Sequence, residues 1–94
     1  MNNININTIN NQELKFVDGK YIGQVVNGMA EGKGIWYGDN GNRYEGDNRN
    51  GKREGKGIFY YNNGDREMGD YYNGKRIGKH AYLTKNGEVK TKNY

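Results

Sequence analysis

Apolar and polar residues follow one another along this chain in short runs separated by turn-forming pairs. Leu14 and Phe16 stand with Lys15 and Val17 just ahead of Asp18-Gly19, a pair suited to the positive φ angles of a tight hairpin. Asn-Gly pairs then bound the later runs, at positions 27–28, 40–41, 50–51, 63–64, 73–74 and 86–87. The apolar period of an amphipathic helix is absent. The pattern predicts strands at about 13–17, 20–26, 32–38, 43–49, 55–61, 66–72, 78–84 and 88–93.

Short turns between successive strands require antiparallel pairing, so we expect an all-β meander of hairpins with no helix longer than one turn. The pattern also repeats every 23 residues. Its bulky members form two series: Trp36, Phe59 and Tyr82, and then Tyr37, Tyr60 and Leu83. Such self-similarity is typical of repeat proteins, whose units bury an apolar face only by stacking on their neighbours.

The odd period constrains the turns. Side chains alternate between the two faces along a strand. A repeat unit with an odd number of residues therefore keeps equivalent side chains on the same face only if it contains an odd-length loop or a bulge. We expect that feature in the turns around 38–42 and 61–65, where Gly and Asn are frequent. A four-residue loop at 28–31 would place aromatic rings across glycines and so recover packing. The expected pairs are Gly23 with Trp36, Gly46 with Phe59 and Gly69 with Tyr82.

Composition is compatible with a small ordered domain. Ile, Val, Leu and Phe together supply only 15 of 94 residues, but the net charge is just +4 and the chain carries nine Tyr and one Trp. Disorder requires low hydrophobicity together with high net charge, and only the first holds here. We expect a disordered Asn-rich segment at 1–12 and a repeat sheet at 13–94, with units of about 21–43, 44–66 and 67–89.

Several residue types are missing. There is no Cys, which excludes disulfides and thiolate metal sites. No apolar run approaches the length of a transmembrane helix, and the first residues lack the basic start and apolar run of a signal peptide. We therefore expect a cytoplasmic protein, with a peripheral position at a membrane as the further alternative.

The glycine pattern resembles the MORN repeat (membrane occupation and recognition nexus), whose unit is Tyr-x-Gly, four residues, Gly, three residues and Gly-x-Gly. Two copies are complete: Tyr21-Ile22-Gly23, Gly28 and Gly32-Lys33-Gly34, then Tyr44-Glu45-Gly46, Gly51 and Gly55-Lys56-Gly57. The third copy keeps Gly69, Gly74 and Gly78 but is degenerate, because Glu67 replaces the Tyr and His80 replaces the last Gly. We expect these repeated Tyr and Gly residues to be structural.

The resemblance implies hairpins stacked side by side in a single elongated, twisted sheet. It also implies a scaffold, a dimerisation surface or an appendage of a larger enzyme such as a lipid kinase or a methyltransferase.

The residues themselves argue against catalysis. With no Ser, no Cys and one His, a nucleophile and its base would have to be built from Thr and His80. The Gly-Lys-Gly segments lead into strands, whereas a phosphate-binding loop leads into a helix. We expect a protein that is not an enzyme and that uses no cofactor and no metal.

Two kinds of residue are candidates for binding. Basic pairs in equivalent turns, with a second ladder at Lys33, Lys56 and Lys79, suit anionic phospholipid headgroups, or simply keep the turns soluble. Aromatic residues on a single-layer sheet suit a protein partner, unless packing on glycine already covers them. We expect a protein partner, with anionic lipid as the alternative, no nucleic acid, and self-association through sheet edges as an option. The candidate binding residues are Trp36, Tyr37, Phe59, Tyr60, Tyr82, Lys52, Arg53, Lys75 and Arg76.

Overall fold

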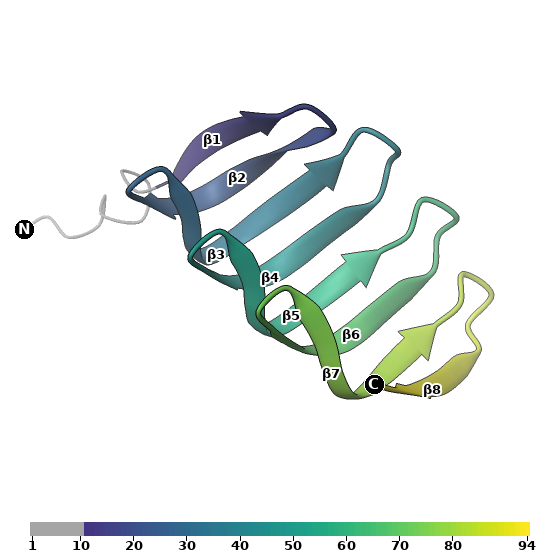
Figure 1. Ribbon diagram of the computed structural model, residues 1–94. Coiled ribbons are helices and arrows are strands. Elements are labelled where there is room, and N and C mark those ends of the chain that lie inside the picture. The colour runs from purple at the N-terminus through teal and green to yellow at the C-terminus, as the bar shows by residue number, and fades with distance from the viewer. Residues whose placement is uncertain (1–10) are drawn as a thin grey trace, which may run out of the picture.

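The computed structural model describes residues 11–94 as one sheet of eight antiparallel strands in chain order, with no helix in this part of the chain (Figure 1). This confirms the predicted all-β meander. The strands are β1 (Asn11–Phe16), β2 (Gly19–Val26), β3 (Met29–Gly38), β4 (Arg43–Arg49), β5 (Lys52–Tyr60), β6 (Arg66–Tyr72), β7 (Lys75–Leu83) and β8 (Val89–Asn93). The sheet begins at Asn11, two residues before the predicted boundary, and the disorder expected for residues 1–10 lies outside the described residues.

Three strands begin earlier than predicted because one turn of each unit is shorter than assumed. The turn after β2 contains only Asn27 and Gly28, with φ angles of 51° and 77°, and Val26 pairs directly with Met29. Positive φ at both central residues is typical of a type I′ hairpin turn. Equivalent turns follow β4 and β6. Strands β3, β5 and β7 therefore start at 29, 52 and 75 rather than at 32, 55 and 78.

The shorter turn makes the predicted register wrong. Gly23 pairs with Gly34 rather than with Trp36, and Gly46 pairs with Gly57 rather than with Phe59. Tyr82 lies opposite Glu67, not opposite Gly69. The aromatic residues of this series instead pair with the first residue of each Tyr-x-Gly motif or with its replacement.

Each of these hairpins contains an enlarged bulge. Between the pairs Gly23–Gly34 and Val25–Ala30, three residues of β3 face one residue of β2. The central bulge residue, Gly32, has a φ of 85°, which glycine adopts without steric cost. In Figure 1 the starts of β3, β5 and β7 rise out of the plane of the sheet at this point. The bend accounts for overall dimensions of 45 × 25 × 25 Å, much thicker than one flat sheet.

The turns at the other end have the odd length that a uniform face requires. Tyr37 pairs with Arg43, and Tyr60 pairs with Arg66, so five residues lie in each loop (38–42 and 61–65). This confirms the expected position of the odd loop. The first hairpin differs from its prediction, because Phe16 pairs with Gly19. Its turn residues are Val17 and Asp18, and neither Asp18 nor Gly19 has a positive φ.

Hydrogen bonds between successive turns join the units. The Gly51 N–H donates to the Ala30 carbonyl at 2.9 Å, and the Gly74 N–H donates to the Arg53 carbonyl at 3.0 Å. At the opposite end the Asn62 side chain donates to the Asn40 carbonyl at 2.8 Å. Neighbouring units are therefore tied at both ends as well as along their strands.

Tyrosine rings packed on glycine form the core. Tyr21 and Tyr44 are 0% and 2% exposed, and a Cβ added to Gly34 or Gly57 would collide with the corresponding ring. The hydroxyl of Tyr44 donates to the Asp47 carbonyl at 2.8 Å, beside the bulge. The tyrosine of each Tyr-x-Gly motif thus fills the space that glycine leaves, a role predicted for the Trp36 series.

We expect Gly57→Ala to lower the free energy of unfolding by about 1–3 kcal/mol, because the new methyl group overpacks against the fixed Tyr44 ring. Chemical denaturation measures this change. In the Tyr44→Ala background the same substitution should cost much less, because the ring that it strikes has been removed. Equal costs in both backgrounds would contradict the ring-on-glycine contact.

Candidate functional site

The candidate binding residues divide between the two faces of the sheet. We name as the inner face the one that carries Tyr21 and Tyr44, and as the outer face the opposite one. Residues paired across antiparallel strands share a face, so the register assigns each side chain. The inner face receives Trp36, Phe59, Tyr82, Arg53 and Arg76, and the outer face receives Tyr37, Tyr60, Lys52 and Lys75.

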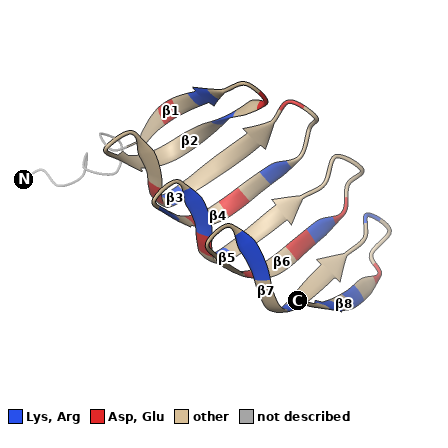
Figure 2. Cartoon of the chain, in the orientation of Figure 1, with Lys and Arg blue, Asp and Glu red and all other residues tan. Residues whose placement is uncertain are grey.

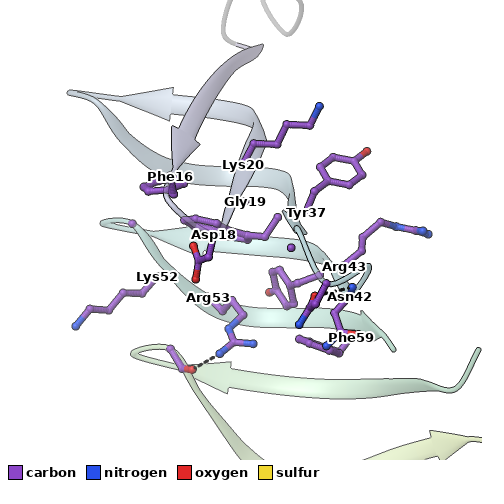
Figure 3. Close-up of a pocket in the computed structure, with 16 residues that line it drawn as sticks. Phe16, Asp18, Gly19, Lys20, Tyr37, Asn42, Arg43, Lys52, Arg53 and Phe59 are labelled. Carbon is purple, nitrogen blue, oxygen red and sulfur yellow. Dashed lines mark hydrogen bonds between the residues drawn. The ribbon is translucent and has the colours of Figure 1, made fainter. Parts of the chain in front are cut away.

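A groove of about 490 Å³ lies along the inner face at the first two units. Phe16, Trp36, Tyr37, Tyr44 and Phe59 supply its aromatic lining, and Arg53 lines it with the guanidinium directed to the Gly74 carbonyl (Figure 3). Trp36 stacks at tilted angles on Phe16 and Tyr21, with ring centroids 5.3 and 5.0 Å apart. Phe16 is nevertheless 48% exposed. The groove therefore offers accessible aromatic surface on a rigid floor.

A hydrogen bond fixes the indole in this groove. Trp36 Nε1 donates to Asn48 Oδ1 at 2.7 Å, and Asn48 Nδ2 donates to the Gly32 carbonyl at 3.1 Å, in the bulge. Asn48 is buried. The sequence drew no attention to Asn48, because the equivalent positions in the other units are Val25 and Tyr71.

The basic pairs of the turns do not form one cationic surface. Arg53 donates to the Gly74 carbonyl at 2.9 Å and lies over the Tyr71 ring, 5.1 Å from its centroid. Arg76 donates to Tyr61 Oη at 3.0 Å. The two arginines therefore belong to the inner packing, while Lys52 and Lys75 are exposed. Figure 2 shows these basic segments at the rising starts of β5 and β7.

The second lysine ladder is partly neutralised. Lys33 Nζ lies 2.5 Å from Asp47 Oδ1, and Lys56 Nζ lies 3.3 Å from Asp70 Oδ1. These ion pairs are exposed, so each contributes at most about 1 kcal/mol to stability. Their main consequence is to reduce the positive charge that this ladder presents.

The third unit contains a buried charged cluster formed by Glu67, His80, Arg76, Tyr61 and Tyr94. Glu67 and His80 are both 0% exposed, and His80 Nδ1 lies 3.0 Å from Glu67 Oε2. Tyr61 and Tyr94 donate to the same carboxylate at 2.9 and 2.7 Å. Arg76 Nε lies 3.4 Å from it.

This cluster replaces the ring-on-glycine contact of the first two units. His80 occupies the position of Gly34 and Gly57, and its ring lies where a Cβ on Gly69 would collide. Glu67 occupies the tyrosine position. The sequence showed the two departures separately. The signal that Glu67 and His80 compensate for each other is that they replace the two partners of one contact, the tyrosine ring and the glycine that it packs on.

Burial raises the pKa of Glu67, but hydrogen bonds from Tyr94 and Tyr61 and the charges of Arg76 and His80 outweigh it, so the net pKa lies below its ordinary value. Tyr82, the third member of the Trp36 series, donates to Asp65 Oδ2 at 2.6 Å, and this bond raises the pKa of Tyr82 to about 12. Full burial gives the Glu67–His80 pair no space for a substrate, so its role is structural. Residues 11–94 hold no group of three or more His, Cys, Asp and Glu residues placed to bind a metal ion.

We expect Glu67→Tyr and His80→Gly to be strongly destabilising as single changes and nearly neutral together. The first puts a ring against the imidazole, and the second removes a partner of a buried carboxylate, at about 3 kcal/mol. The double variant recreates the Tyr44–Gly57 contact of unit two. Denaturation of all four proteins measures the coupling, and additive losses would contradict the compensation.

Stability should also depend on the protonation of Glu67. Because its folded pKa is lowered, its contribution is complete above the ordinary value of 4.5 and is lost as the pH falls through the lower folded pKa. Melting temperatures of the parent and of Glu67→Gln between neutral and acidic pH test this. We expect the parent to be the more stable at neutral pH, and the gap to narrow in acid. A constant gap would contradict the assignment.

Comparison with known proteins identifies the repeat. Residues 21–43 and 44–66 each match the MORN repeat family. A search of the curated proteins gave no match. In the described part of the chain no helix is long and apolar enough to cross a membrane. The family is generally non-catalytic and is consistent with a module for protein or membrane interaction. The chain is a MORN-repeat protein.

Proposed function

We propose that this protein is a non-catalytic scaffold that binds a protein partner in the inner-face groove. The observation that carries the proposal is the groove itself, where partly exposed Phe16, Trp36 and Phe59 stand beside Arg53. Aromatic residues and Arg are enriched in protein interfaces, and they dominate binding energy when they cluster in a well-packed pocket. Trp36 is held by Asn48, so little side-chain entropy is lost on binding.

The charge at the groove favours a partner segment with acidic or carbonyl groups. Lys20, Arg43, Lys52 and Arg53 all border it, whereas Asp18 is the one acidic residue of its lining. Figure 3 shows Lys20 and Lys52 extending away from the groove on opposite sides. A segment lying on the aromatic floor would therefore meet basic side chains at both margins.

Membrane binding is the alternative, and the side-chain contacts make it weaker. Arg53 and Arg76 are engaged within the inner packing, which leaves Lys52 and Lys75 as the exposed cations of the two basic pairs. Each basic residue near an anionic surface contributes about 1 kcal/mol, too little for stable anchoring by two residues. The edge strands β1 and β8 offer unpaired backbone groups, so self-association remains a further proposal.

Peptides selected from a random displayed library on the immobilised protein test the groove. Trp36 is the single tryptophan of the chain, so its fluorescence reports binding at this position. We expect selected peptides to shift the Trp36 emission and to lose about tenfold or more in affinity on Phe59→Ala, as for a residue central to an interface. Ile58→Ala, on the outer face, serves as the matched control.

Vesicles containing phosphoinositide provide the opposing test. The protein scaffold predicts weak co-sedimentation that Lys52→Glu with Lys75→Glu changes little. Strong, salt-sensitive sedimentation that this double change abolishes would instead support the membrane alternative. Lysines are the proper targets here, because reversing Arg53 would disrupt the inner packing.

A further inference from the structure

The outer face carries an apolar row that runs across the strands, along the long axis of the sheet. Cross-strand pairing places Ile22 beside Ile35 and Ile58 beside Met68, with Glu45 between the two pairs. Ile22 and Met68 are 36% and 40% exposed. These side chains face away from the tyrosine core, and their cross-strand contacts still leave apolar surface exposed along the row.

Basic residues follow one margin of this row. Cross-strand pairing forms a second row, parallel to the apolar row and two residues away from it on each strand. In this row Lys20, Arg43 and Arg66 alternate with Tyr37 and Tyr60. The Arg43 guanidinium carbon lies 3.9 Å from the centroid of the Tyr60 ring. Arg43 Nε also donates to Glu45 Oε2 at 2.6 Å, so these two charges balance each other, and the net positive charge of this margin comes from Lys20 and Arg66.

The other margin of the row is nearly neutral. Two ion pairs occupy it, Lys33 with Asp47 and Lys56 with Asp70. The outer face therefore presents an apolar row with a cationic margin on one side and a charge-balanced margin on the other. We name this surface the outer strip, defined by Ile22, Ile35, Ile58, Met68, Lys20, Arg43 and Arg66.

We propose that the outer strip binds a short amphipathic α-helix that carries acidic residues along one side of its apolar stripe. The acidic residues of the partner helix lie on one side only, because charge complementarity places them against the single cationic margin of the strip. The apolar row lies on the opposite face of the sheet from the aromatic floor of the groove, and Lys20 and Arg43 lie at the edge that the two surfaces share. The protein would then hold two partners at once, one on each face.

The spacing of the strip suits a helix. Ile35 and Ile58 are two strands apart, or about 9.5 Å, and residues i and i+7 of a helix are about 10.5 Å apart. Same-face residues of an extended peptide repeat at about 6.7 Å, which matches less well. From Ile22 to Met68 the strip spans about 19 Å, the length of roughly 13 helical residues.

Single-stranded nucleic acid is a weaker fit to the same surface. Base recognition on a sheet depends on free aromatic faces. Arg43 already stacks on Tyr60, and Lys20 Nζ lies 5.6 Å from the Tyr37 centroid. The centre of the strip is aliphatic, and aliphatic side chains do not stack with bases. An amphipathic protein helix would contact both the apolar row and the cationic margin of the strip.

Fluorescein-labelled designed peptides of about 14 residues test the proposal by anisotropy. The probe has Leu at helical spacing and Glu along one flank; one control has Lys in place of Glu, and another has a central Pro. We expect the acidic helix to bind, and both controls to bind at least about tenfold more weakly, a difference of about 1.4 kcal/mol. High salt should weaken the interaction.

Variants locate the site. Ile58→Thr keeps a β-branched side chain, and Arg66→Glu reverses an exposed charge; each should weaken binding of the acidic helix about tenfold. Phe59→Ala in the groove and Lys79→Glu near the neutral margin are the matched controls and should leave it unchanged. Melting curves of each variant show whether the sheet remains folded.

Three results would overturn the proposal. These are no binding of the acidic helix, equal binding of the acidic and basic helices, or a loss of binding on Phe59→Ala but not on Ile58→Thr. Tighter binding of a single-stranded oligonucleotide that is sensitive to Arg66→Glu would reassign the strip to nucleic acid. If the peptide library test of the inner-face groove fails, the test of the outer strip still stands, because Phe59→Ala reports on the groove whereas Ile58→Thr and Arg66→Glu report on the strip.

Discussion

The packing of a tyrosine ring on a pair of glycines is the interaction on which the rest of this structure depends. Tyr44 can be fully buried only because Gly46 and Gly57 lie side by side and leave space for its ring. Its hydroxyl then reaches a carbonyl beside the bulge, so that one side chain fills the gap and satisfies a backbone acceptor at the bend. A sheet with few aliphatic residues thereby obtains a core from tyrosine.

The third unit reaches the same packing by a different chemical solution. Here the ring comes from His80, at the position of the glycine, and Glu67 stands at the position of the tyrosine. The Glu67 carboxylate has tyrosine donors and an arginine around it in place of an apolar contact. A buried charge is costly unless hydrogen bonds surround it, and the cluster supplies them. We therefore expect the stability of the third unit to depend on the protonation of Glu67, whereas tyrosine rings fill the equivalent position in the first two units.

The bend at each bulge gives the two faces different characters. On the inner face, the rising starts of β5 and β7 bring Arg53 and Arg76 over aromatic rings, and Arg53 also lines the groove. On the outer face, aliphatic and charged residues lie in rows across the strands. A thin sheet can therefore present two chemically distinct surfaces, which is a useful property for a scaffold.

The sequence by itself determined the repeat period, the strand number, the meander and the place of the odd-length loops, because alternation and turn chemistry are local properties. It also indicated the MORN family through the full glycine pattern of the first two units. Only the tertiary structure decided the register. Asn27-Gly28 forms a two-residue turn in place of the expected four-residue loop, and the bulge at Gly32 absorbs the two residues that this leaves over. Periodicity cannot distinguish a short turn with a bulge from a longer loop. Register in turn decided that Arg53 faces inward and Lys52 outward. The pairing of Glu67 with His80 also required the fold, because the two residues are thirteen positions apart in the sequence and their side chains meet only across a hairpin.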